Sequence, residues 1–532
     1  MSTFGQVLKE AGEFGLFQKW LLLALCLPSI FSAFNVIGQV FTGLSFPHHC
    51  NTDWILERGP NLTQERQRNL TLPVNKYGQY ESCRMFTPVD WDLEAIEGYG
   101  INMTSECIHG WDYEASIEFS TIVTEMDLVC EEKGFIEASQ SMFMAGCLIG
   151  SLLFGAISDR YGRRFATISS LFGLLLCGVG SAFSPNIYVY IILKFFCGVT
   201  GVLVMQATVI GIEWTGPSHS AFCTTMILLS YPVGLMLLPG IAYLISNWRT
   251  LQLIFFSPLI LLVGLFYWLL PESARWLMTR GKKEEVQKEL LRAARVNRRK
   301  IPQNLLDKLE IEGAGKKENM LDIFTTPYLR NRTLIMGFIW FSSSMLYYGL
   351  SLNVGNFGVN IFLTQFIFGI VEIPAVLSNF VLTQRLGRRL SQAGFLSFGG
   401  AACLLILAIP KDLPLVVTVI AVLGKYFVSA SFSTAYVYTP ELYPTTLRQN
   451  GVGLNSVCGR VAGTVTPLIR LLEVYHHKIP MLIYGIVPLI AGCLSLLLPE
   501  TLNVELQDHT KVKKTKQERT EDDPAVDNLL KV

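Results

Sequence analysis

Three charged residues, Glu372, Lys425 and Arg460, lie inside long apolar stretches of the chain. A charge within a membrane core is costly, so such residues usually pair with one another or line a water-filled cavity. Arg460 stays ionised and presents five N–H donors in a fixed geometry, which suits a carboxylate or a urate-like anion. Two interpretations of Arg460 stay open: contact with an anionic ligand, or a structural ion pair with Glu372.

Lys425 has two interpretations of equal weight. It either binds the same ligand or neutralises Glu372. Asn35 and Gln206 are polar side chains within other apolar stretches, and they are weaker candidates for the same site.

Two basic turns resemble each other. Ser158-Asp-Arg-Tyr-Gly-Arg-Arg164 is repeated as Thr383-Gln-Arg-Leu-Gly-Arg-Arg389. Their arginines can pair with carboxylates at neighbouring helix ends and so latch one side of the protein shut. The alternative is a pair of solvated turns that only orient the chain. The predicted gate residues are Asp159, Arg160, Arg163, Arg164, Glu213, Glu272, Arg388, Arg389, Glu441 and Glu500.

Motifs for enzyme chemistry are missing from the sequence. The segment closest to a nucleotide-binding loop is Gly313-Ala-Gly-Lys-Lys317, but Glu310 stands in place of the first glycine and Lys317 in place of Ser or Thr. We therefore expect neither an enzyme nor an ATP-driven pump, and no metal or cofactor. The net charge of +1 gives no reason to expect a nucleic-acid partner.

Composition indicates a membrane protein. Of the 532 residues, 51% are hydrophobic and 16% are charged, against about 25% charged in soluble domains. Apolar runs long enough to span a bilayer as helices recur along the chain. The twelve predicted spans are 18–42, 136–157, 166–184, 187–211, 222–245, 250–270, 333–352, 361–382, 391–409, 414–437, 450–472 and 479–498.

The chain divides into six segments. The first run has a flank poor in basic residues and is too long for a cleaved signal, so we expect a retained first helix. The segments are 1–42 (N-terminus and first helix), 43–135 (polar loop), 136–270 (rest of a first six-helix half), 271–332 (charged linker), 333–498 (second half) and 499–532 (polar, disordered tail).

An internal repeat relates the two halves. The basic turns are 225 residues apart, Glu213 and Glu441 are 228 apart, and Pro271-Glu-Ser and Pro499-Glu-Thr are also 228 apart. Three matches in one order predict two six-helix halves. Parallel repeats of this kind are typical of the major facilitator fold, which binds its ligand near the membrane midplane between the halves.

Loop charges predict the orientation. Segment 271–332 has 15 Lys or Arg against 9 Asp or Glu, whereas segment 43–135 has 6 against 16. The linker, both basic turns and both termini are therefore expected in the cytosol, and the long loop outside. Four of the 12 cysteines, Cys50, Cys83, Cys107 and Cys130, lie in that loop and suggest two disulfides in one of three pairings. Three of its asparagines, Asn61, Asn69 and Asn102, are glycosylation acceptors, whereas the sequon at Asn331 is placed in the cytosol.

These motifs resemble the organic cation, anion and zwitterion transporters of the major facilitator superfamily, from about residue 5 to residue 505. The segments that carry the resemblance are 12–18, 47–50, 159–164, 271–277, 347–350 and 438–444. Within that family the chain is most similar to the organic anion branch. Segments 296–300 and 480–485 are most similar to the members that exchange nicotinate and urate.

The resemblance implies roles for individual residues. The position of Arg460 is an aspartate in cation carriers and an arginine in anion carriers, although carnitine-type zwitterion carriers also have an arginine there. Lys425 matches a lysine of the tenth helix. Residues implied to face the substrate are Tyr231, Tyr347, Tyr348, Phe432 and Tyr436.

Two positions depart from the family pattern. Val376 stands where organic anion carriers usually have Lys or Arg, which favours monovalent anions over dicarboxylates. Ser220 stands where the family commonly has arginine, and this weakens the predicted latch.

The expected function is secondary transport of small organic anions, such as nicotinate or urate, across the plasma membrane. Alternating access with exchange for a counter-anion is the expected mode, and a carnitine-like zwitterion carrier is the alternative. The ending Leu530-Lys-Val532 weakly suggests a PDZ-type partner.

Overall fold

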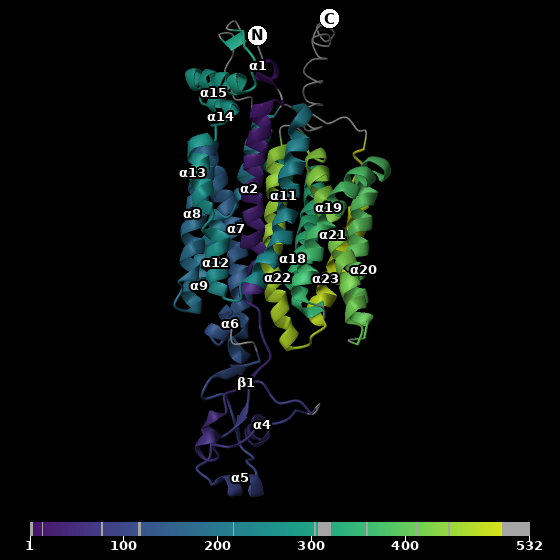
Figure 1. Ribbon diagram of the computed structural model, residues 1–532. Coiled ribbons are helices and arrows are strands. Elements are labelled where there is room, and N and C mark those ends of the chain that lie inside the picture. Colours follow the sequence, from purple (N-terminus) through teal and green to yellow (C-terminus); the bar gives the residue numbers. More distant parts are fainter. Residues whose placement is uncertain are drawn as a thin grey trace, which may run out of the picture.

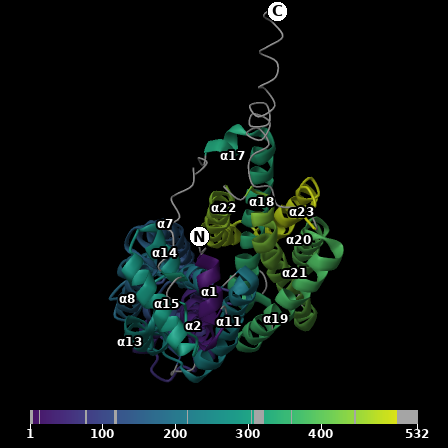
Figure 2. The same ribbon diagram turned by 90° about the horizontal axis from the view of Figure 1, so that it is seen from above.

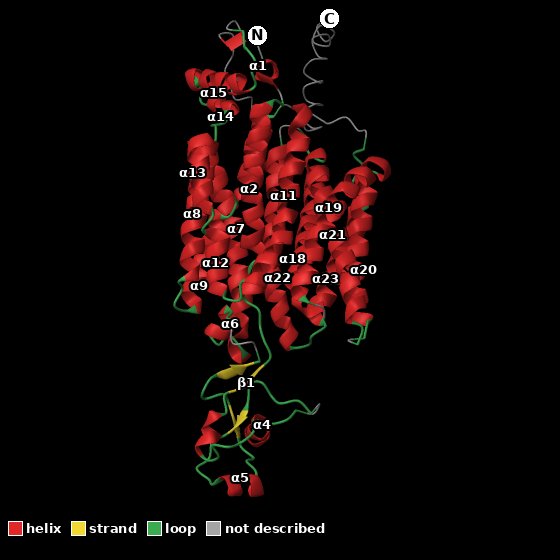
Figure 3. Cartoon of the chain, viewed as in Figure 1, coloured by secondary structure: helices red, strands yellow, loops and turns green. Residues whose placement is uncertain are grey.

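The computed structural model describes residues 4–12, 14–75, 78–114, 119–215, 217–302, 305–306, 321–357, 360–410, 412–444 and 447–502. It is a helical bundle, and within the described residues strands occur only in the loop that follows the first long helix (Figure 3). Long apolar segments form helices because a helix satisfies its own backbone N–H and C=O groups away from water. The tail after 502 and most of 303–320 lie outside the described residues, and so do the C-terminal ending and segment 313–317 discussed above.

Two groups of helices make up the bundle (Figure 2). The first half contains α2 (Leu16–Ile37), α3 (Gln39–Thr42), α7 (Gly134–Tyr161), α8 (Arg163–Ala182), α9 (Ile187–Thr200), α10 (Leu203–Trp214), α11 (Pro217–Leu244), α12 (Trp248–Phe256) and α13 (Leu259–Leu269). The second half contains α18 (Pro327–Leu352), α19 (Ile361–Leu386), α20 (Arg388–Ala408), α21 (Pro414–Glu441), α22 (Arg448–Arg470) and α23 (Ile479–Ser495).

Ten described spans, some built from two consecutive helices, are long and apolar enough to cross a membrane. Helix α23 is apolar but shorter, and α22 is too polar to stand out because it contains Arg448, Arg460 and Arg470. With these two helices the bundle is the predicted twelve-helix architecture, and the fold prediction is confirmed. The polar character of α22 is explained by its position between the halves, described below.

Two helix pairs join the halves. Helix α11 packs against α19, and α7 packs against α22. The view from above shows both pairs at the boundary between the groups (Figure 2). These four helices therefore flank any site that lies between the halves.

The two ends of the bundle differ. At one end, here called the linker end, lie α1 (Phe4–Gly12), α14 (Ala274–Thr279), α15 (Lys283–Val296) and α17 (Leu321–Thr325). At the other end, the loop end, a small domain projects from the bundle (Figure 1). Its elements are β1 (His48–Cys50), η1 (Asp53–Glu57), α4 (Gln64–Thr71), β2 (Met85–Phe86), α5 (Leu93–Tyr99), β3 (Thr104–Ser105), β4 (Trp111–Tyr113), α6 (Ile122–Glu125) and η2 (Cys130–Lys133).

Disulfides and two antiparallel strand pairs hold the loop domain together. Cys50 is bonded to Cys107, and Cys83 to Cys130, one of the three pairings that the sequence allows. Strand β1 pairs with β4, and β2 with β3. A domain with so few buried apolar side chains gains most from such cross-links.

The loop domain is attached to the first half. Glu125 forms an ion pair of 2.5 Å with Arg249 and accepts a hydrogen bond of 2.6 Å from the indole of Trp248. Apolar residues of the domain, including Ile122 and Leu128, share a buried cluster with Tyr190 and Trp248 of the first half.

Two short 3-10 helices follow long helices: η3 (Val354–Phe357) comes after α18, and η4 (Leu471–Val474) comes after α22. A break separates α9 from α10. The predicted span 187–211 is thus two helices, separated at Gly201 and Val202. Helix α18 begins at Pro327, so Asn331 lies in its exposed first turns rather than in the linker.

Candidate substrate site

A cavity of about 280 Å³ lies between the two halves. Its walls come from α2, α7, the α9–α10 break and α11 of the first half, and from α18, α19, α21 and α22 of the second. This volume is close to the lower limit of about 300 Å³ for small-molecule sites. We call it the central cavity.

Arg460 lines the central cavity from the middle of α22. Its Nη1 donates a weak hydrogen bond of 3.4 Å to the carbonyl of Cys147 on α7. Its Nε is buried without a hydrogen-bond partner, and no carboxylate of the described residues lies within ion-pair distance of the guanidinium. A buried charge of this kind strongly favours an anionic partner.

Lys425 does not line the cavity but lies behind its wall. Its Nζ is 2.8 Å from Oε1 of Glu372 and 3.2 Å from the ring centroid of Tyr347, and it donates a 2.7 Å hydrogen bond to Ser351. The hydroxyl of Tyr347 donates to the same carboxylate at 2.7 Å. Of the two interpretations, this conformation shows Lys425 neutralising Glu372, while Arg460 is not paired with Glu372.

Two charged residues thus line the central cavity: Glu372, whose carboxylate is paired with Lys425, and Arg460, whose guanidinium has no ion-pair partner among the described residues. The cavity has a net charge of +1 when Lys425 is counted with Glu372. Val376, one helical turn beyond Glu372 on α19, lines the same wall. The cavity therefore lacks the Lys or Arg that organic anion carriers usually have at the position of Val376.

Aromatic side chains form one continuous wall. Tyr347 meets Tyr348 and Phe432 edge to face, with centroids 5.4 and 5.5 Å apart. Trp340 contacts Phe432 at 6.1 Å and Tyr436 at 4.7 Å. Such edge-to-face pairs hold one another in place and leave ring faces for a flat ligand.

Six of the nine residues predicted to bind substrate line the central cavity together: Arg460, Tyr231, Tyr347, Tyr348, Phe432 and Tyr436. Asn35 and Gln206 do not. Their amides donate to backbone carbonyls of Cys197, at 3.4 Å, and Phe154, at 3.3 Å. Since both side chains are buried among helices of the first half, we assign them a structural role.

Several lining residues were not predicted, and they are mostly small or apolar. They include Ser32, Val36, Met144, Met205, Trp340, Ser344, Ser429, Ser433 and Ser456. The signal that finds them is helical spacing. Trp340 and Ser344 precede the predicted Tyr348 at four-residue intervals on α18. On α21, Ser429 and Ser433 lie beside the predicted Phe432 and Tyr436, so on each helix they continue the predicted face.

The halves meet at the loop end. Arg470 of α22 and Glu137 of α7 form an ion pair of 3.2 Å, and the ring of Phe362 on α19 stacks on Phe41 and contacts Tyr243, at 5.3 and 5.5 Å. Near the linker end, the ion pairs of the two basic turns stay within each half. Met205 and Tyr436, which line the cavity on that side, are 40% and 47% exposed. The cavity is thus closed toward the loop end and open toward the linker end.

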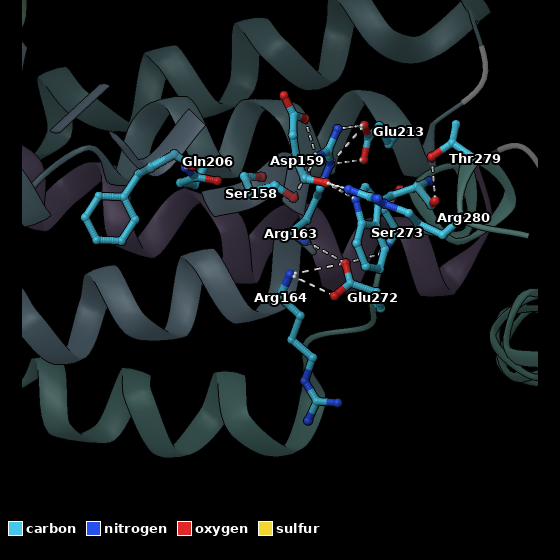
Figure 4. Close-up of polar contacts among 12 residues, drawn as sticks. Ser158, Asp159, Arg163, Arg164, Gln206, Glu213, Glu272, Ser273, Thr279 and Arg280 are labelled. Carbon is cyan, nitrogen blue, oxygen red and sulfur yellow. Dashed lines mark hydrogen bonds and ion pairs between the residues drawn. The ribbon is translucent and has the colours of Figure 1, made fainter. Parts of the chain in front are cut away.

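The first basic turn builds a cluster within the first half (Figure 4). Arg163 bridges Asp159 and Glu213, at 2.7 and 3.1 Å. Glu272 accepts hydrogen bonds from the backbone N–H groups of Arg163 and Arg164, which open α8. Gly162 has φ +105°, and a Cβ there would collide with Glu272, so only glycine lets the carboxylate approach.

The second basic turn repeats this geometry. Arg388 pairs with Glu441 at 3.1 Å, and the backbone N–H groups of Arg388 and Arg389 donate to Glu500 at 2.8 and 3.1 Å. Gly387, with φ +86°, again makes room for the carboxylate. Burial would raise the pKa of Glu500, but its four backbone N–H donors lower that pKa below the ordinary value of 4.5.

Each predicted gate cluster therefore closes on itself within one half. A latch that shuts the linker end requires contacts between the halves, whereas these pairs are formed within each half. In this conformation each cluster joins helix ends of one half, and a role in closing the linker end stays a prediction. Arg160 joins neither cluster; its guanidinium lies 5.3 Å from the ring of Tyr161.

Comparison with known proteins gives three consistent findings. Residues 132–467 match the family described as Major Facilitator Superfamily. The chain is 43% identical to solute carrier family 22 member 13 of Homo sapiens, over 96% of this chain and 92% of that protein. It is 36% identical to organic anion transporter 3 of Homo sapiens, over 95% of this chain and 92% of that protein.

Solved structures agree on the fold. The chain resembles the partially occluded, inward-open xylose transporter XylE from E. coli with a TM-score of 0.59 and 15% identity, covering 91% of this chain and 98% of that one.

Proposed function

The chain belongs to the Major Facilitator Superfamily and, within it, to the organic anion branch of the solute carrier 22 family, and we propose that it carries small organic monoanions across the plasma membrane. A transporter of this family is not an enzyme. The mechanism is alternating access of the central cavity, with exchange for a second anion.

One observation carries the proposal: Arg460 is the single uncompensated charge that lines the central cavity among the described residues. A substrate carboxylate or urate oxygen would accept hydrogen bonds from N–H groups of its guanidinium. Charge-assisted bonds of this kind are roughly twice as strong as neutral ones.

The size and charge of the cavity narrow the substrate class. A volume of about 280 Å³ suits a molecule with one or two rings, which the aromatic wall would hold by stacking. Because Val376 adds no cation, a dicarboxylate would bring one unpaired negative charge into a buried site. Nicotinate, urate and related monoanions fit better.

The zwitterion alternative is not favoured by this geometry. The aromatic wall could contact an ammonium group, but the carboxylate that would neutralise it, that of Glu372, already pairs with Lys425 and accepts from Tyr347. A carnitine-like cation would have to displace Lys425 from a fully buried ion pair. Such displacement leaves an uncompensated charge, which costs several kcal/mol.

Sidedness follows from the charges. We assign the linker end, with its basic segments, to the cytosol, so the conformation is inward-open and the loop domain is extracellular.

Asn61, Asn69 and Asn102 are exposed on that domain and are the proposed sites of N-glycosylation. Glycosidase treatment that changes gel mobility for the wild type, but not for the triple Asn→Gln variant, supports the assignment. Sugar on Asn331 would reverse it.

Uptake in oocytes tests the function. Wild type and Arg460→Ala are compared for labelled nicotinate, urate, 2-oxoglutarate, carnitine and one organic cation, with and without preloaded unlabelled nicotinate. Arg299→Ala, which removes an exposed arginine far from the cavity, is the matched control. Surface expression is measured by biotinylation.

We expect monoanion uptake that preloading accelerates, and an uptake loss of at least about tenfold in Arg460→Ala, since losing one charge-assisted hydrogen bond costs about 1.5–3 kcal/mol. Full anion transport by Arg460→Ala, or uptake of carnitine or the cation alone, would overturn the proposal. If anion uptake is not accelerated by preloading, the proposal of anion transport stands, but the proposal that it occurs by exchange is rejected.

A further inference from the structure

A second cavity of about 190 Å³ lies between the halves at the loop end. It is lined by residues of both halves and by Val123 and Leu128 of the loop domain. Its polar lining consists of Gln39, Lys133, Glu137, Gln140 and Arg470, with Ser45 at the rim. We call it the outer cavity.

The outer cavity holds two cations and one carboxylate. Arg470 is shared between Glu137, at 3.2 Å, and the carbonyl of Leu352, at 3.4 Å. Lys133 is exposed and has no ion-pair partner in the part of the chain that the structure describes. Glu473 lies nearby on η4 but does not line the cavity. The lining therefore has an excess of positive charge.

A lining residue of this cavity also has an unsatisfied polar atom. Gln39 is 5% exposed and lines the cavity, and its Oε1 has no hydrogen-bond partner, while its Nε2 is held by the carbonyl of Ile136 at 2.9 Å. A buried acceptor without a donor is unusual in a folded protein. A ring N–H or hydroxyl of a bound ligand would satisfy it.

The two cavities follow one another along the same helices. On α7, Glu137 and Gln140 line the outer cavity and Met144 and Cys147 line the central one. On α22, Arg460 lines the central cavity and Arg470 the outer one, about 15 Å apart at 1.5 Å per residue. Each cavity thus contains one arginine of the same helix.

We propose that the outer cavity is a second binding site for organic monocarboxylates, whose carboxylate binds Arg470 and Lys133. In the closed state, the carboxylate of Glu137 takes the place of the ligand beside Arg470. This inference rests on the proposed function, since it assigns the entry site for the same substrate class. When an anion arrives from outside, its carboxylate takes Arg470 from Glu137. The ion pair between α7 and α22 is then broken, and the halves are free to separate at the loop end.

A reporter cysteine tests the site without requiring transport. Ser45, exposed at the rim, is changed to cysteine, and its rate of modification by an impermeant methanethiosulfonate ammonium reagent is measured from outside on intact cells. Nicotinate and benzoate are the probes. The measurement is made in the Arg460→Ala background, where ligand binding in the central cavity is impaired. Protein without the reporter cysteine gives the background rate.

In Ser45→Cys/Arg460→Ala we expect at least one probe to slow modification with a saturable dose dependence. Adding Arg470→Gln raises the half-protecting concentration by at least about tenfold, the cost of one charge-assisted hydrogen bond. Adding Glu137→Gln lowers it, because the competing carboxylate is gone.

The matched control is the ion pair between Glu125 and Arg249, also at the loop end but within the first half. Arg249→Gln is expected to leave protection unchanged. The final extent of modification and surface biotinylation show that each variant is folded and accessible, and Arg470→Lys, which keeps the charge, is expected to keep most of the protection.

Three results would overturn the outer site: no protection by either probe, protection that survives Arg470→Gln, or protection that is lost with Arg460→Ala alone. Failure of the proposed function is a separate result: monoanion transport that persists in Arg460→Ala rejects the role of the central arginine, whatever the reporter at Ser45 shows.

Discussion

At the scale of single residues, the ion-pair partners decide function. The sequence identifies Glu372, Lys425 and Arg460 as charges in apolar surroundings, but it does not show which of them pair, because they lie on three different helices. In the structure Lys425 takes the carboxylate and Arg460 is left for a ligand. Trp340 is part of the same wall and was missed, since one tryptophan among many aromatics gives no signal of its own.

The Glu372–Lys425 pair gives a prediction at this scale. Glu372→Gln or Lys425→Met alone leaves one buried charge without its partner and should destabilise the second half by about 3–5 kcal/mol. Both single variants are expected to show low surface expression and a lower melting temperature in detergent. The double variant Glu372→Gln/Lys425→Met removes both charges and should recover expression.

The recovered double variant also separates stability from binding. Because the central cavity keeps Arg460, monoanion uptake per molecule at the surface should be retained. If the double variant expresses normally but transports nothing, the Glu372–Lys425 pair contributes to substrate binding directly, and the purely compensating role is wrong.

At the scale of elements, the basic turns are recognisable from sequence whereas their partners are not. Glycines and arginines at fixed spacing identify the turns, and the repeat finds the carboxylates. Whether those carboxylates lie in the same half or across the interface depends on how α8 and α20 pack, and this follows from tertiary structure. The structure places each set within one half.

Glycine substitutions test these turns. Gly162→Ala and Gly387→Ala place a Cβ at positive φ and against a carboxylate, and each should destabilise the protein by roughly 1–3 kcal/mol. Gly155→Ala, on α7 just before the first basic turn, is the control, because nothing lies within 4 Å of a Cβ there. Thermal unfolding in detergent measures the difference; equal melting temperatures for Gly162→Ala and Gly155→Ala would contradict the assigned role of Gly162.

At the scale of the whole molecule, the fold was predictable and the conformation was not. Apolar runs, loop charges and the internal repeat predict twelve helices in two halves. The helix breaks at Gly201 and Ser257, the disulfide pairing and the two cavities depend on contacts between distant segments. No local pattern encodes which end of the bundle is closed, since both conformations use one sequence.

The attachment of the loop domain predicts a pH dependence. Burial would raise the pKa of Glu125, but hydrogen bonds and the ion pair from Arg249, together with the Trp248 indole, lower it. A carboxyl whose pKa is lower in the folded state stabilises above its ordinary pKa, and this contribution is lost as the pH falls through the folded value. Limited proteolysis of the loop domain should accelerate on acidification below about pH 4.5.

Glu125→Gln is the test of that dependence. It should accelerate cleavage already at neutral pH and flatten the acid-induced change. Glu57→Gln, which changes an exposed carboxylate of η1 in the same domain, should leave the profile as in the wild type. Identical profiles for Glu125→Gln and wild type would mean that other contacts hold the domain.

The loop domain is joined to the first half through Glu125, Trp248 and a shared apolar cluster, and it extends well beyond the bundle (Figure 1). It therefore acts as a lever arm: a small rotation of the first half becomes a much larger sweep at its tip. A fluorophore on the tip and another on the second half would report each transport cycle from outside the cell. An antibody fragment wedged between the domain and the second half would stall the carrier without entering either cavity.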